Sequence, residues 1–206
     1  RNATPLAVLI TAIGVSYLLQ NAALLIFGSA AKNFPVLIDV PDLKIAEGLT
    51  VSGVTVVTIC VTVVIMTGLM LFMKYTKPGA AMQAVSEDRG AAQLMGVNVN
   101  STISLTFAIG SALAAVASLL LCSAYPQISP YTGAMPGIKA FVAAVFGGIG
   151  SIPGAMIGGI LLGIIENLSK AYISSQLSDA IVFGVLIVVL IIRPTGIMGK
   201  KMNEKV

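Results

Sequence analysis

The chain has 206 residues, of which 57% are hydrophobic and 10% are charged, and its mean hydropathy is +0.99. Soluble domains carry about 25% charged residues, so this composition excludes an ordinary soluble protein and predicts an integral membrane protein. The net charge of +4 comes from Lys and Arg residues in loops and at chain ends. That distribution is typical of the positive-inside rule, and it does not indicate nucleic-acid binding.

Six apolar segments follow one another, and they predict an all-α, polytopic transmembrane helical bundle. A helical span needs about 20 apolar residues. We expect the segments at 5–28, 51–73, 102–124, 138–147, 154–168 and 180–192. The second is rich in Val, Thr and Ile, as a buried strand would be. A lone strand in lipid leaves its backbone unpaired, so we predict a helix there as well.

Glycine, serine and proline interrupt the apolar run that contains the fourth and fifth segments. The interruption lies at 147–154, and it predicts two short segments with a non-helical joint between them. Elsewhere, the mixed composition of 32–49 predicts a water-exposed loop, and Pro78 followed by Gly79 predicts a turn. Asn98 is one candidate N-cap for the third segment.

The charged stretch 86–96 lies between the second and third segments and predicts a short helix of its own. We expect Ser86 as its N-cap, and Glu87 and Asp88 in the first turn, where the helix dipole favours negative charge. Gly96 can adopt the left-handed conformation that ends a helix. One weakly apolar face is predicted from three residues at helical spacing, Val85, Ala92 and Met95.

The distribution of basic residues predicts the orientation of the chain. With 86–96 in the cytoplasm, eight basic residues lie inside and four lie outside, and the C-terminus is cytoplasmic. The inside set is Arg1, Lys74, Lys77, Arg89, Arg193, Lys200, Lys201 and Lys205. The outside set is Lys32, Lys44, Lys139 and Lys170.

The usual signatures of an enzyme are missing from the sequence. There is no histidine and no phosphate-binding glycine-rich loop with its Lys and Ser/Thr. Cys60 and Cys122 lie in separate apolar runs and predict buried free thiols. No sequence pattern pairs Glu166 with Asp179 as a catalytic dyad. We therefore predict no enzyme activity, no catalytic residue, no metal site and no cofactor bound by this chain.

Polar or unwound positions inside apolar segments are the candidates for a translocation path. They are Gln20, Asn21, Gly147, Gly148, Gly150, Ser151, Pro153 and Gly154. Two other roles are open: Gln20 and Asn21 can bond between helices, and 147–154 can form a tight packing turn. Glu166 and Asn167, at the end of the fifth segment, are expected to extend toward the membrane interface.

Four motifs together resemble the branched-chain amino-acid permease subunits of ABC importers. The stretch 81–98 contains Ala91-Ala92-x-x-x-Gly96 and resembles the EAA signature of such permeases. The other three motifs are 9–14, 146–155 and 193–196. They occur in the family's order over essentially the whole chain, and they are most similar to the high-affinity leucine, isoleucine and valine permeases.

The resemblance implies a multi-pass permease subunit of the bacterial cytoplasmic membrane that carries branched-chain amino acids. It implies two cytoplasmic ATPase subunits that bind the ATP, a second permease subunit and an extracytoplasmic substrate-binding protein. The implied ATPase-coupling residues are Glu87, Asp88, Arg89, Ala91, Ala92 and Gly96. Gly90 stands where the family often has an acidic residue, so we expect the contact with the ATPase to depend on the remaining charges and the small-residue face.

Family members are longer at the N-terminus, so we expect residues 1–206 to form a single transmembrane permease domain without the family's first spans. A secondary transporter that uses 147–154 as its site is an alternative, and a non-transporting membrane subunit is another. Few buried acids and no evident inverted repeat disfavour the secondary transporter.

Overall fold

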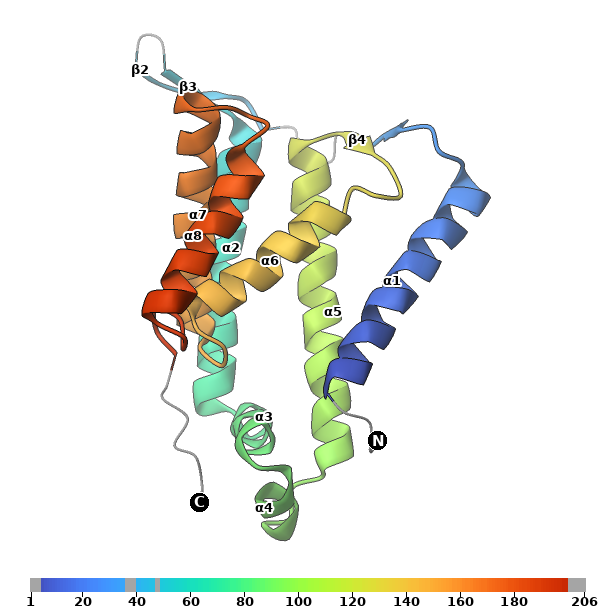
Figure 1. Cartoon of the computed structure of the whole chain (residues 1–206), viewed down its shortest axis with the longest axis vertical. Coiled ribbons are helices and arrows are strands. Elements are labelled where there is room, and N and C mark those ends of the chain that lie inside the picture. The colour runs from blue at the N-terminus through green and yellow to red at the C-terminus, as the bar shows by residue number, and fades with distance from the viewer. Residues whose placement is uncertain (1–4, 36–39, 47–48, 200–206) are drawn as a thin grey trace. The chain divides into compact units, whose positions relative to one another are not determined.

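The computed structural model describes residues 5–35, 40–46 and 49–199, and most of these residues are helical (Figure 1). The helices of the described residues are α1 (Pro5–Phe27), α2 (Gly53–Tyr75), α3 (Lys77–Glu87), α4 (Arg89–Leu94), α5 (Val99–Ala124), α6 (Ala134–Gly147), α7 (Ile152–Tyr172) and α8 (Ser178–Ile192). The strands are β1 (Lys32–Asn33), β2 (Leu43–Ala46), β3 (Leu49–Val51) and β4 (Gln127–Ile128). The all-α prediction is confirmed.

Four helices are long and apolar enough to cross a membrane: α1, α2, α5 and α7. The helical prediction for the Val/Thr-rich segment is confirmed, because α2 is helical over 23 residues. Helices α6 and α8 are apolar but shorter, with 14 and 15 residues. The chain is therefore a polytopic helical membrane protein, as its composition predicts.

Helix α7 is longer than the predicted fifth segment at both ends, and the non-helical joint is shorter than predicted. The joint is reduced to residues 148–151, because Pro153 and Gly154 lie within α7. The Ser151 hydroxyl accepts a hydrogen bond from the Gly154 N–H at 3.1 Å and caps the helix. Proline is tolerated in a first helical turn, where its missing N–H has no helical partner to lose.

The contacts divide the chain into two compact units, each described here by itself. Unit 1 is Arg1–Val64 with Ala81–Ala134, and unit 2 is Ile65–Ala80 with Met135–Val206. In unit 1, β1 pairs antiparallel with β4, and β2 pairs antiparallel with β3. The sequence predicted a loop over 32–49, where β1, β2 and the start of β3 lie, and it predicted no strand. The β1–β4 pairing joins segments far apart in the chain, which no local pattern reveals.

Unit 2 has a small apolar core where α6, α7 and α8 meet. Its buried residues are Val142, Phe146, Leu162 and Val182. The segment after α8 folds back onto the end of α6: the Ile197 and Met198 N–H groups donate to the carbonyl oxygens of Phe146 and Gly147 at 3.0 and 2.9 Å. These bonds fix the end of α6, and with it the turn that leads into α7.

Two smaller expectations are wrong, and some basic residues cannot be placed. Pro78 and Gly79 form the first turn of α3 instead of a loop, since the Gly79 N–H donates to the Thr76 hydroxyl at 3.1 Å. The Cys60 thiol is free but exposed, because no part of the chain that the structure describes covers it. Four basic residues of the orientation count lie outside the described residues: Arg1, Lys200, Lys201 and Lys205.

Candidate functional site

The charged stretch 86–96 consists of the end of α3 followed by the short helix α4. Ser86 lies inside α3, where its hydroxyl donates to the Gln83 carbonyl oxygen at 2.7 Å, so its prediction as an N-cap is wrong. Asp88 caps α4 instead: its Oδ1 accepts from the N–H groups of Gly90 and Ala91 at 2.9 and 3.0 Å. Aspartate caps helices as well as serine does, and α3 starts early enough to include Ser86.

These boundaries also change the places of Glu87 and Asp88. We predicted both in the first turn of a helix, but Glu87 is the last residue of α3 and Asp88 precedes α4. The prediction for Gly96 is confirmed, because its φ is +84°. The Val97 N–H then donates to the Ala92 carbonyl oxygen at 3.0 Å, which closes the end of α4.

The two faces of α4 differ sharply in exposure. Ala92 is 4% exposed and Val85 is also buried, as the predicted apolar face requires. Met95 was predicted on the same face, but it is 85% exposed, and its neighbour Leu94 is 91% exposed. Helix α4 ends after six residues and Met95 is its C-cap residue. Met95 therefore does not continue the helical spacing that was predicted from Val85 and Ala92. Two large apolar side chains therefore project from a polar stretch between membrane helices.

The glycines of the joint between α6 and α7 allow close backbone packing. Gly148 has a φ of +111°, and a Cβ there would collide with the Gly199 backbone. A Cβ on Gly147 would collide with the backbone of Gly154. Gly150 has a φ of +89° but open space around it. Together with the Ser151 cap, these contacts give Gly147, Gly148, Gly150 and Gly154 a packing or turn function.

The polar pair in α1 forms hydrogen bonds within its own helix. The Asn21 side-chain N–H donates to the Tyr17 carbonyl oxygen at 2.8 Å, and the Gln20 amide lies 3.5 Å from the Ser16 hydroxyl. Both residues belong to unit 1, whereas the glycine joint belongs to unit 2. A role in translocation stays a prediction for both groups.

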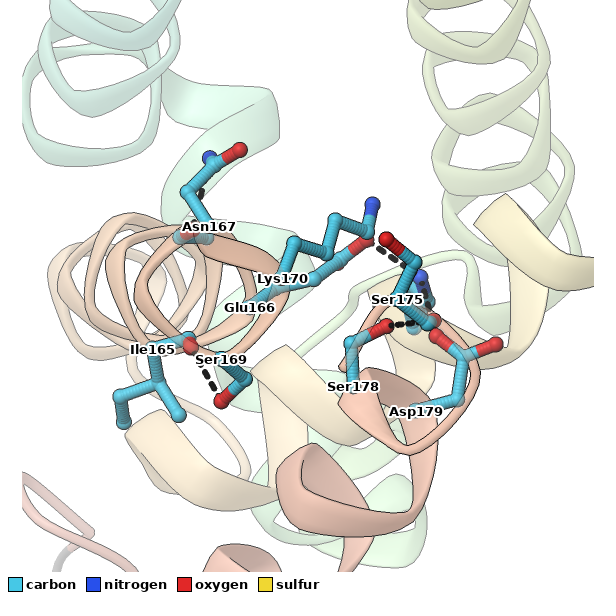
Figure 2. Close-up of polar contacts among 10 residues, drawn as sticks. Ile165, Glu166, Asn167, Ser169, Lys170, Ser175, Ser178 and Asp179 are labelled. Carbon is cyan, nitrogen blue, oxygen red and sulfur yellow. Dashed lines mark hydrogen bonds and ion pairs between the residues drawn. The ribbon is translucent and has the colours of Figure 1, made fainter. Parts of the chain in front are cut away.

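A cluster of four charged side chains in unit 2 was missed by sequence reasoning. Lys139 of α6 contacts Glu166 of α7 and Asp179 of α8, with both Nζ–O distances 2.8 Å. Glu166 also pairs with Lys170 at 2.5 Å. Figure 2 shows Glu166 and Lys170 extending from α7 toward the start of α8, while Asn167 points away from them.

Only one of these pairs has a signal in the sequence. Glu166 and Lys170 are four residues apart on a helix, a spacing that brings side chains together. The pairs with Lys139 join different helices, so no local pattern predicts them. Glu166 was expected to extend toward the interface, but it is held by two lysines and is 18% exposed.

A cavity of about 330 Å³ opens beside this cluster. Its lining residues are Pro136, Lys139, Ala140 and Ala143 of α6, Gly159, Leu162, Gly163 and Glu166 of α7, and Val182 of α8. Lys139 and Glu166 are its charged residues, and the rest are apolar or glycine. Within the described part of the chain, no group of three or more His, Cys, Asp or Glu residues is placed to hold a metal ion.

Residues 3–190 match the family described as branched-chain amino acid transport system, permease component. The chain belongs to this family. The high-affinity branched-chain amino acid permease protein LivH of Escherichia coli K12 is 46% identical over 209 aligned residues, which cover 100% of this chain and 68% of LivH. BraD of Pseudomonas aeruginosa has the same identity and coverage. A probable LivH of Methanocaldococcus jannaschii is 36% identical over 155 residues, which cover 72% of this chain and 49% of that relative. No solved structure matches the chain.

The family that the sequence motifs indicated is thus confirmed. The family match and the four apolar helices together make the chain a membrane-spanning permease component. Its named relatives are transport permeases, not enzymes. The motifs that carried the resemblance now have positions in the structure. The stretch 81–98 forms the end of α3 and α4, and 146–155 forms the turn between α6 and α7.

Proposed function

We propose that this chain is a permease subunit of an ATP-driven importer that carries branched-chain amino acids across a bacterial inner membrane. Two separate ATPase subunits bind and hydrolyse the ATP, and an extracytoplasmic protein delivers the amino acid. A second permease subunit completes the pathway. The names of the relatives support the substrate class, and the structure of α4 supports a contact with a separate motor.

The observation that carries the proposal is the exposure of Leu94 and Met95. Water-exposed apolar side chains of this size contribute no packing energy to the permease itself. They provide anchors for a partner, because large apolar groups that fill a partner's pocket dominate binding energy. In this proposal they enter a groove of the ATPase, and closure of the ATPase moves α4 as a rigid body.

The predicted coupling residues take different roles in this contact. Asp88 and Gly96 define the two ends of α4, and Ala92 anchors it within unit 1. Glu87, Arg89 and Ala91 are exposed and are placed to contact the ATPase. The charge on Glu87 and Arg89 replaces part of the contact that an acidic residue at Gly90 would make.

The proposal places α4 and the C-terminus in the cytoplasm, following the positive-inside count. The glycine joint 148–151 then serves the close packing of α6 against α7, which its backbone contacts support. Transport through the path still depends on this joint, because it fixes the relative positions of two membrane helices.

The test replaces both anchors, as Leu94→Ser with Met95→Ser, in the assembled importer. We expect co-purification of the ATPase to fall at least tenfold, and ATP-driven leucine uptake by proteoliposomes to fall with it. Tyr172→Ser is the matched control, because Tyr172 is 84% exposed and lies at the end of α7. It should leave ATPase binding unchanged.

Two results would contradict the proposal. One is full ATPase association in the double variant. The other is leucine uptake by the wild-type protein that follows a proton gradient with no ATPase bound, which would favour the secondary transporter.

A further inference from the structure

We propose that the cavity between α6, α7 and α8 binds a zwitterionic amino acid with an apolar side chain. The ammonium and carboxylate groups of the ligand would exchange with the ion pairs at Lys139 and Glu166. Its side chain would occupy the apolar part of the cavity. This inference rests on the proposed transport function and adds a substrate-contacting site to it.

The cavity has the size and composition of a small-molecule site. Its volume of about 330 Å³ lies within the range of roughly 300–1,000 Å³ that is usual for ligand pockets. Such pockets are mostly apolar and carry a few placed polar groups. Here the lining residues follow one face of α6 and one face of α7, at spacings of three and four residues.

The charged and apolar groups are separated along the cavity. Lys139 and Glu166 lie together, since their side chains are 2.8 Å apart, and Pro136 is the one lining residue that precedes Lys139 on α6. Ala143 is four residues beyond Lys139 on α6, and Gly159 is seven residues before Glu166 on α7. At 1.5 Å per residue, these spacings correspond to about 6 and 10 Å along the helices. An amino acid has the same polarity, with both charges at one end and its side chain at the other.

The cluster carries two charges of each sign, which suits a zwitterion. Lys139 bridges Glu166 and Asp179, and Lys170 contacts Glu166. A ligand carboxylate can take the place of an acidic side chain beside Lys139 while the ligand ammonium pairs with the released acid. All charges then stay paired. A ligand with a single charge would leave one group of the cluster without a partner.

The glycines of α7 show where its backbone packs against α6 and where space is left beside it. A Cβ on Gly158 would collide with Ala143 and Gly147, so this glycine packs α7 against α6. A Cβ on Gly163 would have nothing within 4 Å, and one on Gly159 would lie 3.8 Å from the Ala143 Cβ. Gly159 and Gly163 line the cavity, and Gly158 does not.

The first test fills the cavity with Gly163→Leu in proteoliposomes that contain the assembled importer, its ATPases and leucine-loaded binding protein. We expect leucine uptake to fall at least tenfold, while ATP hydrolysis stimulated by the binding protein stays within twofold of wild type. Retained hydrolysis shows that the complex is assembled. Gly68→Leu is the matched control, because Gly68 lies on α2 with open space around it and does not line the cavity. It should transport normally.

The second test removes both charged groups of the cavity lining, as Lys139→Gln with Glu166→Gln. Neutral amides can still hydrogen-bond to each other, and the double change removes one charge of each sign, so that Asp179 and Lys170 remain as one charge of each sign. If the pair only holds α6 against α7, the two amides should replace it and leucine uptake should be normal. We expect instead a loss of uptake of at least tenfold with hydrolysis retained.

The outcomes separate this inference from the proposed function. Wild-type-like leucine uptake by either cavity variant would overturn the site and leave the importer assignment intact. Failure of the wild-type complex to couple ATP hydrolysis to leucine uptake would overturn the importer assignment itself.

Discussion

At the residue scale, Asp88 shows how one side chain sets the boundary between α3 and α4. Its Oδ1 accepts two backbone hydrogen bonds from the first turn of α4, and so sets the residue at which the chain turns from α3 into α4. The carboxylate thus has a local role in holding the helix, in addition to any charge that it offers to a partner. The contribution of the cap and that of the charge can be separated by substitution.

We predict that Asp88→Ala weakens ATPase binding and that Asp88→Asn does not. Loss of an N-cap costs about 1 kcal/mol, which lowers the ratio of formed to unformed helix by about fivefold. Asparagine keeps the acceptor oxygen and removes only the charge. ATPase retained on the purified permease is the measurement. Equal losses in both variants would mean that the negative charge, not the cap, is what the ATPase recognises.

At the element scale, the distance between α6 and α7 depends on glycine contacts. The backbone of α7 approaches that of α6 at Gly158, and the joint 148–151 turns the chain between them. Helices in lipid gain little from burying apolar surface against one another, so close backbone approach carries much of their packing. The same pair of helices separates again at Gly163, where the cavity opens.

We therefore predict opposite effects for two Gly→Ala changes in α7. Alanine favours a helix over glycine by about 1 kcal/mol at either site. At Gly158 the new methyl group meets the Ala143 and Gly147 backbone, and overpacking of this kind costs about 1–3 kcal/mol. Gly158→Ala should lower the thermal unfolding midpoint of the purified complex, and Gly163→Ala should leave it unchanged or raise it. A midpoint for Gly158→Ala at or above wild type would show that α6 and α7 do not pack as described.

At the scale of the whole molecule, four helices are long and apolar enough to cross a membrane, and the proposed orientation follows from the basic residues of the loops. Each span can be recognised from its own sequence, because it is apolar over the thickness of the bilayer core. The orientation rests on charge outside the spans. This makes the topology a property that labelling can test without any transport assay.

We predict that Gln93→Cys is labelled from the cytoplasm and Gln127→Cys from outside. Both glutamines are exposed, Gln93 in α4 and Gln127 in β4. The native thiols Cys60 and Cys122 are first replaced by alanine. A membrane-impermeant maleimide should label the residue 127 variant in right-side-out vesicles and the residue 93 variant only in inverted vesicles. The reverse pattern would overturn the cytoplasmic placement of α4.

The sequence by itself determined the class of the protein, its apolar spans and its family. Span recognition needs only composition and length, since lipid allows few backbone conformations other than a helix. The motifs around Ala92, Gly148 and Arg193 carried the resemblance because each is contiguous in the chain. The left-handed Gly96 was also readable, because glycine adopts that conformation without strain.

Only the tertiary structure decided which polar residues meet and which side of α4 is exposed. Lys139, Glu166 and Asp179 come from three helices, and their contacts depend on helix packing that no single segment encodes. Ser86 and Asp88 are both good N-caps, so local propensity could not choose between them. The extent of α3 made that choice, and it left Leu94 and Met95 exposed where a partner can reach them.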